Sequence, residues 1–192
     1  MALRQCVKQL RSTDGVLDVF LFGSTARGDT APRDVDLLIL FEKRIDENVV
    51  HAFKTGLADA GFDVDVRGRT WSGLFESIFL ARESILSDAY SLFHHEFLSE
   101  LFGYRSFILF RYSLFGKSAT TRVLFHYALN GRKSANTKKM GMIENLNAVK
   151  LSNSTILVPS WNSEHFSKFL NDNAVSFKKF PVLVPLKVVT QK

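Results

Sequence analysis

The residues best suited to chemistry lie in one segment, Asp18 to Phe41, with the sequence DVFLFGSTARGDTAPRDVDLLILF. An apolar, β-prone run ends in Gly23-Ser24, and nine residues then separate Ser24 from Asp34. Glycine lets a backbone approach a ligand closely, and a helix that begins after Ser24 would point its free N–H groups at a phosphate. The segment therefore predicts a strand that ends in a phosphate-binding turn.

Two carboxylates, Asp34 and Asp36, stand at the head of a second apolar run, Val35 to Phe41. Side chains at i and i+2 of a strand lie on the same face, so both carboxylates point the same way. Two such groups repel each other unless a cation lies between them. Mg²⁺ is typically bound by one or two carboxylates together with substrate phosphates. The pair therefore predicts a divalent-cation site.

A third carboxylate is available in the alternating segment Phe62 to Val66, where Asp63 and Asp65 share one face. If this strand lies beside Val35–Phe41, one of the two can join the first pair. Three carboxylates and a phosphate-binding turn are suited to two-metal, in-line displacement at phosphorus.

These motifs resemble the nucleotidyltransferases of the DNA polymerase beta superfamily, especially its minimal nucleotidyltransferase branch. The family pattern is a hydrophobic residue, Gly-Ser, roughly ten residues, then Asp-hydrophobic-Asp-hydrophobic. Here it reads Phe22-Gly23-Ser24 and Asp34-Val35-Asp36-Leu37, and the G-S-x-x-R-G form of the minimal branch spans Gly23 to Gly28. The family's third acidic residue follows a helix, and Val64-Asp65-Val66 matches it, with Asp63 as second choice. The resemblance covers roughly residues 1–100.

The resemblance implies roles for these residues. Asp34 and Asp36 would hold Mg²⁺ against a nucleoside triphosphate such as ATP, and Asp65 would bind a second ion nearer the attacking hydroxyl, with Mn²⁺ as a possible substitute. Gly23 and Ser24 would hold the β and γ phosphates. Arg27 has two interpretations: a contact to phosphate or leaving pyrophosphate, or a local ion pair with Asp29.

The elements that must position these residues alternate, which predicts an α+β fold. We expect helices over residues 2–12, 46–60, 72–102, 118–129 and 135–149 and from residue 163, and strands over 16–22, 35–41, 62–66, 106–112 and 155–158. Residues 177–189 look extended, with Pro181 and Pro185 confining them to a sheet edge or breaking the strand. The expected architecture is a polymerase-beta-like core with a small mixed sheet and flanking helices, residues 1–102, and then a small basic α+β domain, residues 103–192.

Charge is divided unevenly between these two parts. Residues 1–100 carry 11 Lys and Arg against 16 Asp and Glu, whereas residues 101–192 carry 14 against 3. The basic half could bind nucleic acid, be merely a solvated basic surface, or pack on the acidic half. The densest basic cluster, and the candidate nucleic-acid contact, is Arg132, Lys133, Lys138 and Lys139.

Composition excludes several classes of protein. The 192 residues are 46% hydrophobic and 23% charged, as in folded globular proteins. The longest stretch without an acidic or basic residue is 13 residues long, whereas a membrane-spanning helix needs about 20. The single cysteine, Cys6, excludes an internal disulfide and a cysteine zinc site, so we expect a reducing, cytoplasmic setting.

The sequence leaves the acceptor open. The first hypothesis is an active nucleotidyltransferase that modifies an RNA end, a protein hydroxyl or a small molecule. The alternatives are a non-catalytic nucleotide- or nucleic-acid-binding module, which the intact carboxylates disfavour, and an antitoxin-type partner of a HEPN-like toxin. The basic second half is not part of that antitoxin pattern.

Overall fold

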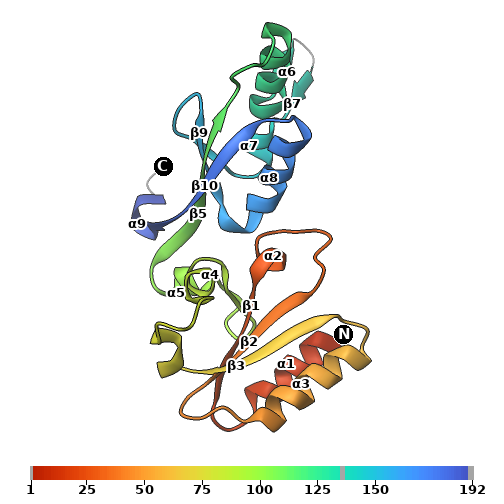
Figure 1. The fold of residues 1–192 in the computed structure, drawn as a ribbon, viewed down its shortest axis with the longest axis vertical. Helices are drawn as coiled ribbons and strands as arrows, with labels where there is room; N and C mark the ends of the chain where they lie inside the picture. The colour runs from red at the N-terminus through yellow and green to blue at the C-terminus, as the bar shows by residue number, and fades with distance from the viewer. Residues whose placement is uncertain (1, 135–136, 190–192) are drawn as a thin grey trace. The chain divides into compact units, whose positions relative to one another are not determined.

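The chain folds as two compact units, residues 1–104 and 105–192, each with its own sheet and hydrophobic core (Figure 1). The structure is a computed structural model that describes residues 2–134 and 137–189. It confirms the mixed α and β fold class predicted from the sequence. Within the described ranges, no helix is both long and apolar enough to cross a bilayer.

The first unit is built on a four-stranded mixed sheet with the order β3-β2-β1-β4. Its strands are β1 (Val16–Phe22), β2 (Val35–Phe41), β3 (Val64–Thr70) and β4 (Tyr90–Ser91). β1 pairs antiparallel with β2 and β4, whereas β2 pairs parallel with β3. A parallel pair needs a crossover connection, and a helix between β2 and β3 supplies it.

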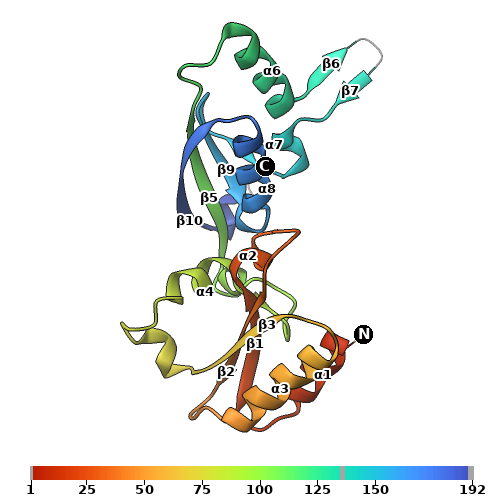
Figure 2. The same ribbon diagram turned by 45° about the vertical axis from the view of Figure 1, so that its right-hand side comes forward.

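One face of this sheet is covered by α1 (Ala2–Arg11) and α3 (Glu47–Asp59), which lie side by side (Figures 1 and 2). Asp46 caps α3, because its carboxylate accepts hydrogen bonds from the backbone N–H groups of the first turn at 3.0 and 3.4 Å. The apolar stripe of α3 packs on inward-facing residues of the strands, among them Leu37, Ile39 and Val66. This packing fixes which side chains of β2 and β3 point away from the helices.

The opposite face is covered by short helices, so the helical structure expected over residues 72–102 is present only in part. The segment forms η1 (Ser72–Phe75), α4 (Arg82–Asp88), β4 and α5 (Leu98–Leu101). It leaves the helical path at Tyr90 and Ser91 because these residues pair with β1, where the Ser91 hydroxyl donates to the buried Asp18 carboxylate at 2.7 Å. A strand pairing between distant segments thus overrides the local helical pattern.

The second unit has a four-stranded sheet with the order β10-β5-β9-β8. The strands are β5 (Tyr104–Ser113), β8 (Val149–Lys150), β9 (Thr155–Pro159) and β10 (Ser176–Pro185). β9 pairs antiparallel with both β5 and β8. β10 contains Pro181 and Pro185 and lies at an edge of the sheet, as the sequence predicts.

Aromatic side chains form much of the core of this unit. Phe110 of β5 packs edge-on against Phe166 at 4.8 Å, and Phe125 stacks on Phe169 at 5.4 Å. Phe125 comes from α6 (Ala119–Asn130), and Phe166 and Phe169 come from α8 (Ser163–Asp172), which η2 (Ser160–Asn162) precedes. α9 (Leu186–Val189) is the last described element.

The helix expected over residues 135–149 is also wrong. The described residues there form the hairpin β6 (Arg132–Ser134) and β7 (Thr137–Lys139), and only α7 (Met142–Asn145) is helical. Residues 135 and 136 lie outside the described part of the chain. Figure 2 shows the hairpin as a separate ribbon beside α6, outside the four-stranded sheet.

Candidate active site

The turn after β1 brings its backbone against a carboxylate. Gly23 opens the one-turn helix α2 (Gly23–Ala26), so the helix starts two residues earlier than expected and is short. Gly23 has a φ of +74°, and a Cβ at this position would collide with a carboxylate oxygen of Asp36. Glycine therefore serves both the left-handed conformation and the close approach of Asp36.

Asp34 and Asp36 lie at the start of β2, as the sequence predicts. Asp36 pairs in register with Phe22, the last residue of β1, and Asp34 directly precedes the strand. Both residues are half-buried. Asp36 thus lies at the point where β1 delivers the Gly23-Ser24 turn.

The third carboxylate is placed by the parallel pairing of β2 with β3. Asp65 is the register partner of Asp36, and the N–H of Val35 donates to the carbonyl of Asp63 at 2.9 Å. Directly paired residues of neighbouring strands point to the same face, so Asp36 and Asp65 are neighbours there. Asp63 is exposed and precedes β3. This arrangement favours Asp65 over Asp63, although the role of either residue stays a prediction.

The electrostatic environment of Asp36 reflects this crowding. Burial raises the pKa of the Asp36 carboxyl above its ordinary value of 3.8, and the nearby Asp34 and Asp65 carboxylates raise it further. The guanidinium groups of Arg67 and Arg27 oppose this rise in pKa. Three carboxylates are therefore close enough to repel one another.

Arg67 is a residue of this site that the sequence analysis missed. Its Nε and Nη2 donate to Oδ2 of Asp65, at 2.9 and 2.6 Å. The same contact raises the pKa of Arg67, chiefly through the hydrogen bond to Asp65. A signal for it exists in the sequence, because Arg67 is two residues beyond Asp65 on the same face of a strand.

Arg27 joins the turn to a neighbouring helix. Its Nη1 lies 3.1 Å from Oδ2 of Asp88 in α4, and the Asp88 side chain is only 6% exposed. The partner considered from the sequence, Asp29, accepts a hydrogen bond from the N–H of Ala31 at 3.0 Å. The observed ion pair with Asp88 gives Arg27 a structural role.

The donor set suits a hard divalent cation, because it consists of carboxylate oxygens. Within residues 2–134 and 137–189, however, no three Asp, Glu, His or Cys side chains are arranged to hold a metal ion as they stand. Asp65 is hydrogen-bonded to Arg67 instead. The residues fit a metal in the type of their donor atoms, and Asp65 would have to leave Arg67 to bind one.

The four basic residues singled out in the sequence come together on the β6–β7 hairpin. The backbone register pairs Arg132 with Lys139 and Lys133 with Lys138. The Arg132 guanidinium lies over the ring of Tyr127, 5.1 Å from its centre. The cluster is therefore a hairpin and not, as expected, a loop followed by a helix.

Comparison with known proteins matches one family, over the first unit and the start of the second. The model of the family described as "Nucleotidyltransferase domain" matches residues 1–114. No curated protein and no solved structure gives a significant match. The family match includes all three carboxylates and the Gly23-Ser24 turn.

The raised pKa of Asp36 predicts that the ionised carboxylate destabilises the folded chain in a pH-dependent way. Since the folded chain binds this proton more tightly than the unfolded chain, stability falls as pH rises from 3.8 through the raised pKa. Asp36→Asn should therefore raise the melting temperature in EDTA at neutral pH by a few degrees, but not at acidic pH where both states are protonated. The matched control is Asp14→Asn, in an exposed turn. If Asp36→Asn instead lowers the melting temperature at neutral pH, this interpretation is wrong.

The Arg27–Asp88 ion pair predicts a loss of stability when Arg27 is removed. Arg27→Ala should lower the free energy of unfolding by about 1–3 kcal/mol, because it leaves a buried carboxylate without its cation. Arg33→Ala, in the same loop and exposed, should have little effect in the same urea titration. Unchanged stability in Arg27→Ala would leave ligand binding as the main role of Arg27.

Proposed function

The chain belongs to the nucleotidyltransferase domain family, and we propose that it is an active, Mg²⁺-dependent member that transfers a nucleoside monophosphate from a triphosphate to an acceptor hydroxyl, releasing pyrophosphate. The observation that carries the proposal is the adjacency of Asp36 and Asp65 on paired strands, with Asp34 two residues before Asp36. A cluster of like charges raises the free energy of the folded chain, so its presence calls for a cationic ligand.

In this proposal Asp34 and Asp36 hold the metal that accompanies the triphosphate, and Asp65 holds the one nearer the acceptor. Bound divalent ions, Mg²⁺ or Mn²⁺, would neutralise charge on the phosphates and lower the pKa of the attacking hydroxyl. Asp65 would assist by accepting or orienting that proton. The α-phosphorus–oxygen bond to the acceptor forms as the bond to pyrophosphate breaks.

The Gly23-Ser24 turn would bind the β and γ phosphates of the donor, ATP among the candidates. The missing Cβ at Gly23 makes room for the Asp36 carboxylate, which would bring a metal held by Asp36 next to the phosphates. Arg27 is bonded to Asp88 and contributes positive potential near Asp36, which favours an anionic ligand.

Arg67 would act as the counterion of Asp65 before a metal binds. The pair is partly exposed, with 58% of the Arg67 side chain and 33% of the Asp65 side chain accessible, so solvent screens it. Its disruption would cost about 1 kcal/mol or less, which a divalent cation between carboxylates can offset.

The acceptor class stays a hypothesis. An RNA end would benefit from the basic second unit and from the hairpin cluster of Arg132, Lys133, Lys138 and Lys139, whereas a protein hydroxyl, such as that of a HEPN-type partner, would not require it. A neighbouring HEPN-type reading frame would favour the protein acceptor.

One observation favours a second candidate function. Because Asp65 is bonded to Arg67 and the described residues lack a ready three-ligand group, a non-catalytic nucleotide-binding module is the alternative. Incubation with each labelled triphosphate, Mg²⁺ and candidate acceptors separates the two, since a binding module would form no transfer product.

Metal-dependent triphosphate binding is the first expected property. Calorimetry should show tighter ATP binding with Mg²⁺ than with EDTA, and Asp34→Asn with Asp36→Asn should abolish that difference. A circular dichroism spectrum like that of the unchanged chain is the control for folding. Equal affinity with and without metal in the unchanged chain would refute the assignment.

The third carboxylate predicts a separate effect on transfer. Asp65→Ala should lower the transfer rate by about a hundredfold or more while changing ATP affinity little, because Asp65 would serve the acceptor side. Asp63→Ala is the matched control. If Asp63→Ala is inactive and Asp65→Ala is active, the assignment within β3 is wrong.

Arg67→Gln should tighten Mg²⁺ binding about two- to fivefold by removing the competing cation.

A further inference from the structure

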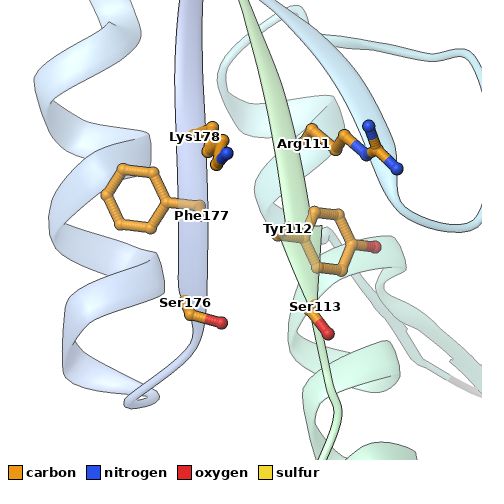
Figure 3. A pocket seen from close by; sticks show the side chains of 6 residues that line it. All are labelled: Arg111, Tyr112, Ser113, Ser176, Phe177 and Lys178. Carbon is orange, nitrogen blue, oxygen red and sulfur yellow. The ribbon is translucent and has the colours of Figure 1, made fainter.

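Two adjoining hollows lie at the end of β5 in the second unit. One, of about 390 Å³, lies between β5 and β10 and is lined by Arg111, Tyr112, Ser113, Ser176, Phe177 and Lys178 (Figure 3). The other, of about 540 Å³, shares Arg111, Tyr112 and Ser113 and is completed by residues of α6 and of the turn before β9, notably Arg122, His126, Asn153 and Ser154. The two hollows thus share the end of β5 as a common wall.

The described residues that line these hollows include Arg111, Arg122 and Lys178, and none of them is a carboxylate. In the described part of the chain, no ion pair joins Arg111, Arg122 or Lys178 to an acidic residue. The next residue, Lys179, behaves differently, since its ammonium lies 3.5 Å from the Glu164 carboxylate. Among the described residues these three cations therefore have no acidic side chain within ion-pair distance, and they line concave surfaces.

Figure 3 shows how these groups are presented. Lys178 and Ser176 project from β10 toward β5, and the Ser113 hydroxyl lies at the same end of the gap. Phe177 points the other way, toward α8, and packs 5.7 Å from Phe110 in the core. Polar groups thus face the hollow, while the residue between them anchors the strand.

The second hollow is held rigid by Tyr112. Its hydroxyl donates to the carbonyl of Asn153 at 2.8 Å, and its N–H donates to the carbonyl of Ser154 at 2.9 Å. Its ring packs 5.5 Å from Phe125, which positions α6. The Nε of Arg122 donates to the carbonyl of Lys117 at 3.0 Å. A hydrogen bond that already orients a guanidinium lowers the entropy lost when that group binds a ligand.

The chemistry of these walls matches phosphate. Phosphate oxygens accept several hydrogen bonds at once, and guanidinium, ammonium and hydroxyl groups here can donate them. One anion would need only one hollow, whereas a strand with a charge on every nucleotide can place phosphates in both. Tyr112 is 4% exposed, too little to stack on a base, so binding should not depend on base identity.

We propose that the two hollows bind successive phosphates of a single-stranded nucleic acid. The proposal does not require the nucleotidyltransferase activity, because the residues that line the hollows include neither the three carboxylates nor the Gly23-Ser24 turn. It also differs from the hairpin cluster, because no residue of the described part of that hairpin is among those that line either hollow.

The test measures binding of a short fluorescein-labelled oligouridylate to the full chain by fluorescence anisotropy, in EDTA without triphosphate. Arg111→Ala, Arg122→Ala and Lys178→Ala together should weaken binding about tenfold or more, and should flatten the slope of log K against log salt by about 2, since each lost single-strand contact contributes about 0.7. The matched control removes three exposed lysines outside the hollows, Lys150, Lys168 and Lys187, and should have a smaller effect.

Further arms distinguish the competing ligands. Oligothymidylate should bind comparably, whereas inorganic phosphate and an oligoglutamate peptide should compete poorly. Asp34→Asn with Asp36→Asn should bind the strand as the unchanged chain does, so loss of the catalytic proposal would leave this one intact. If the triple variant fails to fold by circular dichroism, the single charge reversal Lys178→Glu replaces it and should still weaken binding.

Four results would overturn the proposal. The first two are the absence of binding by the unchanged chain at low salt, and equal weakening in the triple alanine variant and in the lysine control. The other two are weakening only when the hairpin cluster is replaced by alanine, and an affinity for the oligoglutamate peptide equal to that for the oligouridylate.

Discussion

The parallel pairing of β2 with β3 is the constraint on which the candidate active site depends. It sets Asp36 beside Asp65. The next residue of each strand, Leu37 or Val66, points to the other face and belongs to the core under α1 and α3. A slip of one residue in either strand would turn the carboxylates into that core and move Leu37 and Val66 out of it, so the register is strongly specified. The same apolar packing that stabilises the sheet therefore holds the carboxylates together against their repulsion.

Neighbouring residues partly offset the repulsion among the three carboxylates. Arg67 binds Asp65 directly, Arg27 adds positive potential while paired with Asp88, and Gly23 makes room for the Asp36 carboxylate. The pKa of Asp36 is nevertheless raised, so compensation is incomplete. A site whose charges destabilise the folded chain before a ligand binds is typical of functional centres, where local strain or repulsion is retained because a ligand relieves it.

The sequence predicted the parts of the fold whose signals are local. The apolar run from Val16 to Phe22 is β1 with the same bounds, and the capped, amphipathic segment after Asp46 is α3. The prediction from the sequence failed in two places. Over residues 72–102, pairing with β1 overrides the helical periodicity, and over residues 135–149 the formation of a hairpin does so. In the site, the spacing of Asp34 and Asp36 was readable, but the preference for Asp65 required the β2–β3 register. The Arg27–Asp88 ion pair joins residues 61 positions apart, which no local pattern indicates.

A crystal structure with Mn²⁺ and a non-hydrolysable triphosphate would test the central claim most directly, because anomalous scattering locates the metal without assumptions about the ligands. The account predicts an anomalous peak between Asp34, Asp36 and Asp65, with the guanidinium of Arg67 moved away from Asp65 and the triphosphate against Gly23 and Ser24. A triphosphate bound elsewhere, or a metal that ignores these carboxylates while the Arg67–Asp65 pair stays intact, would contradict it.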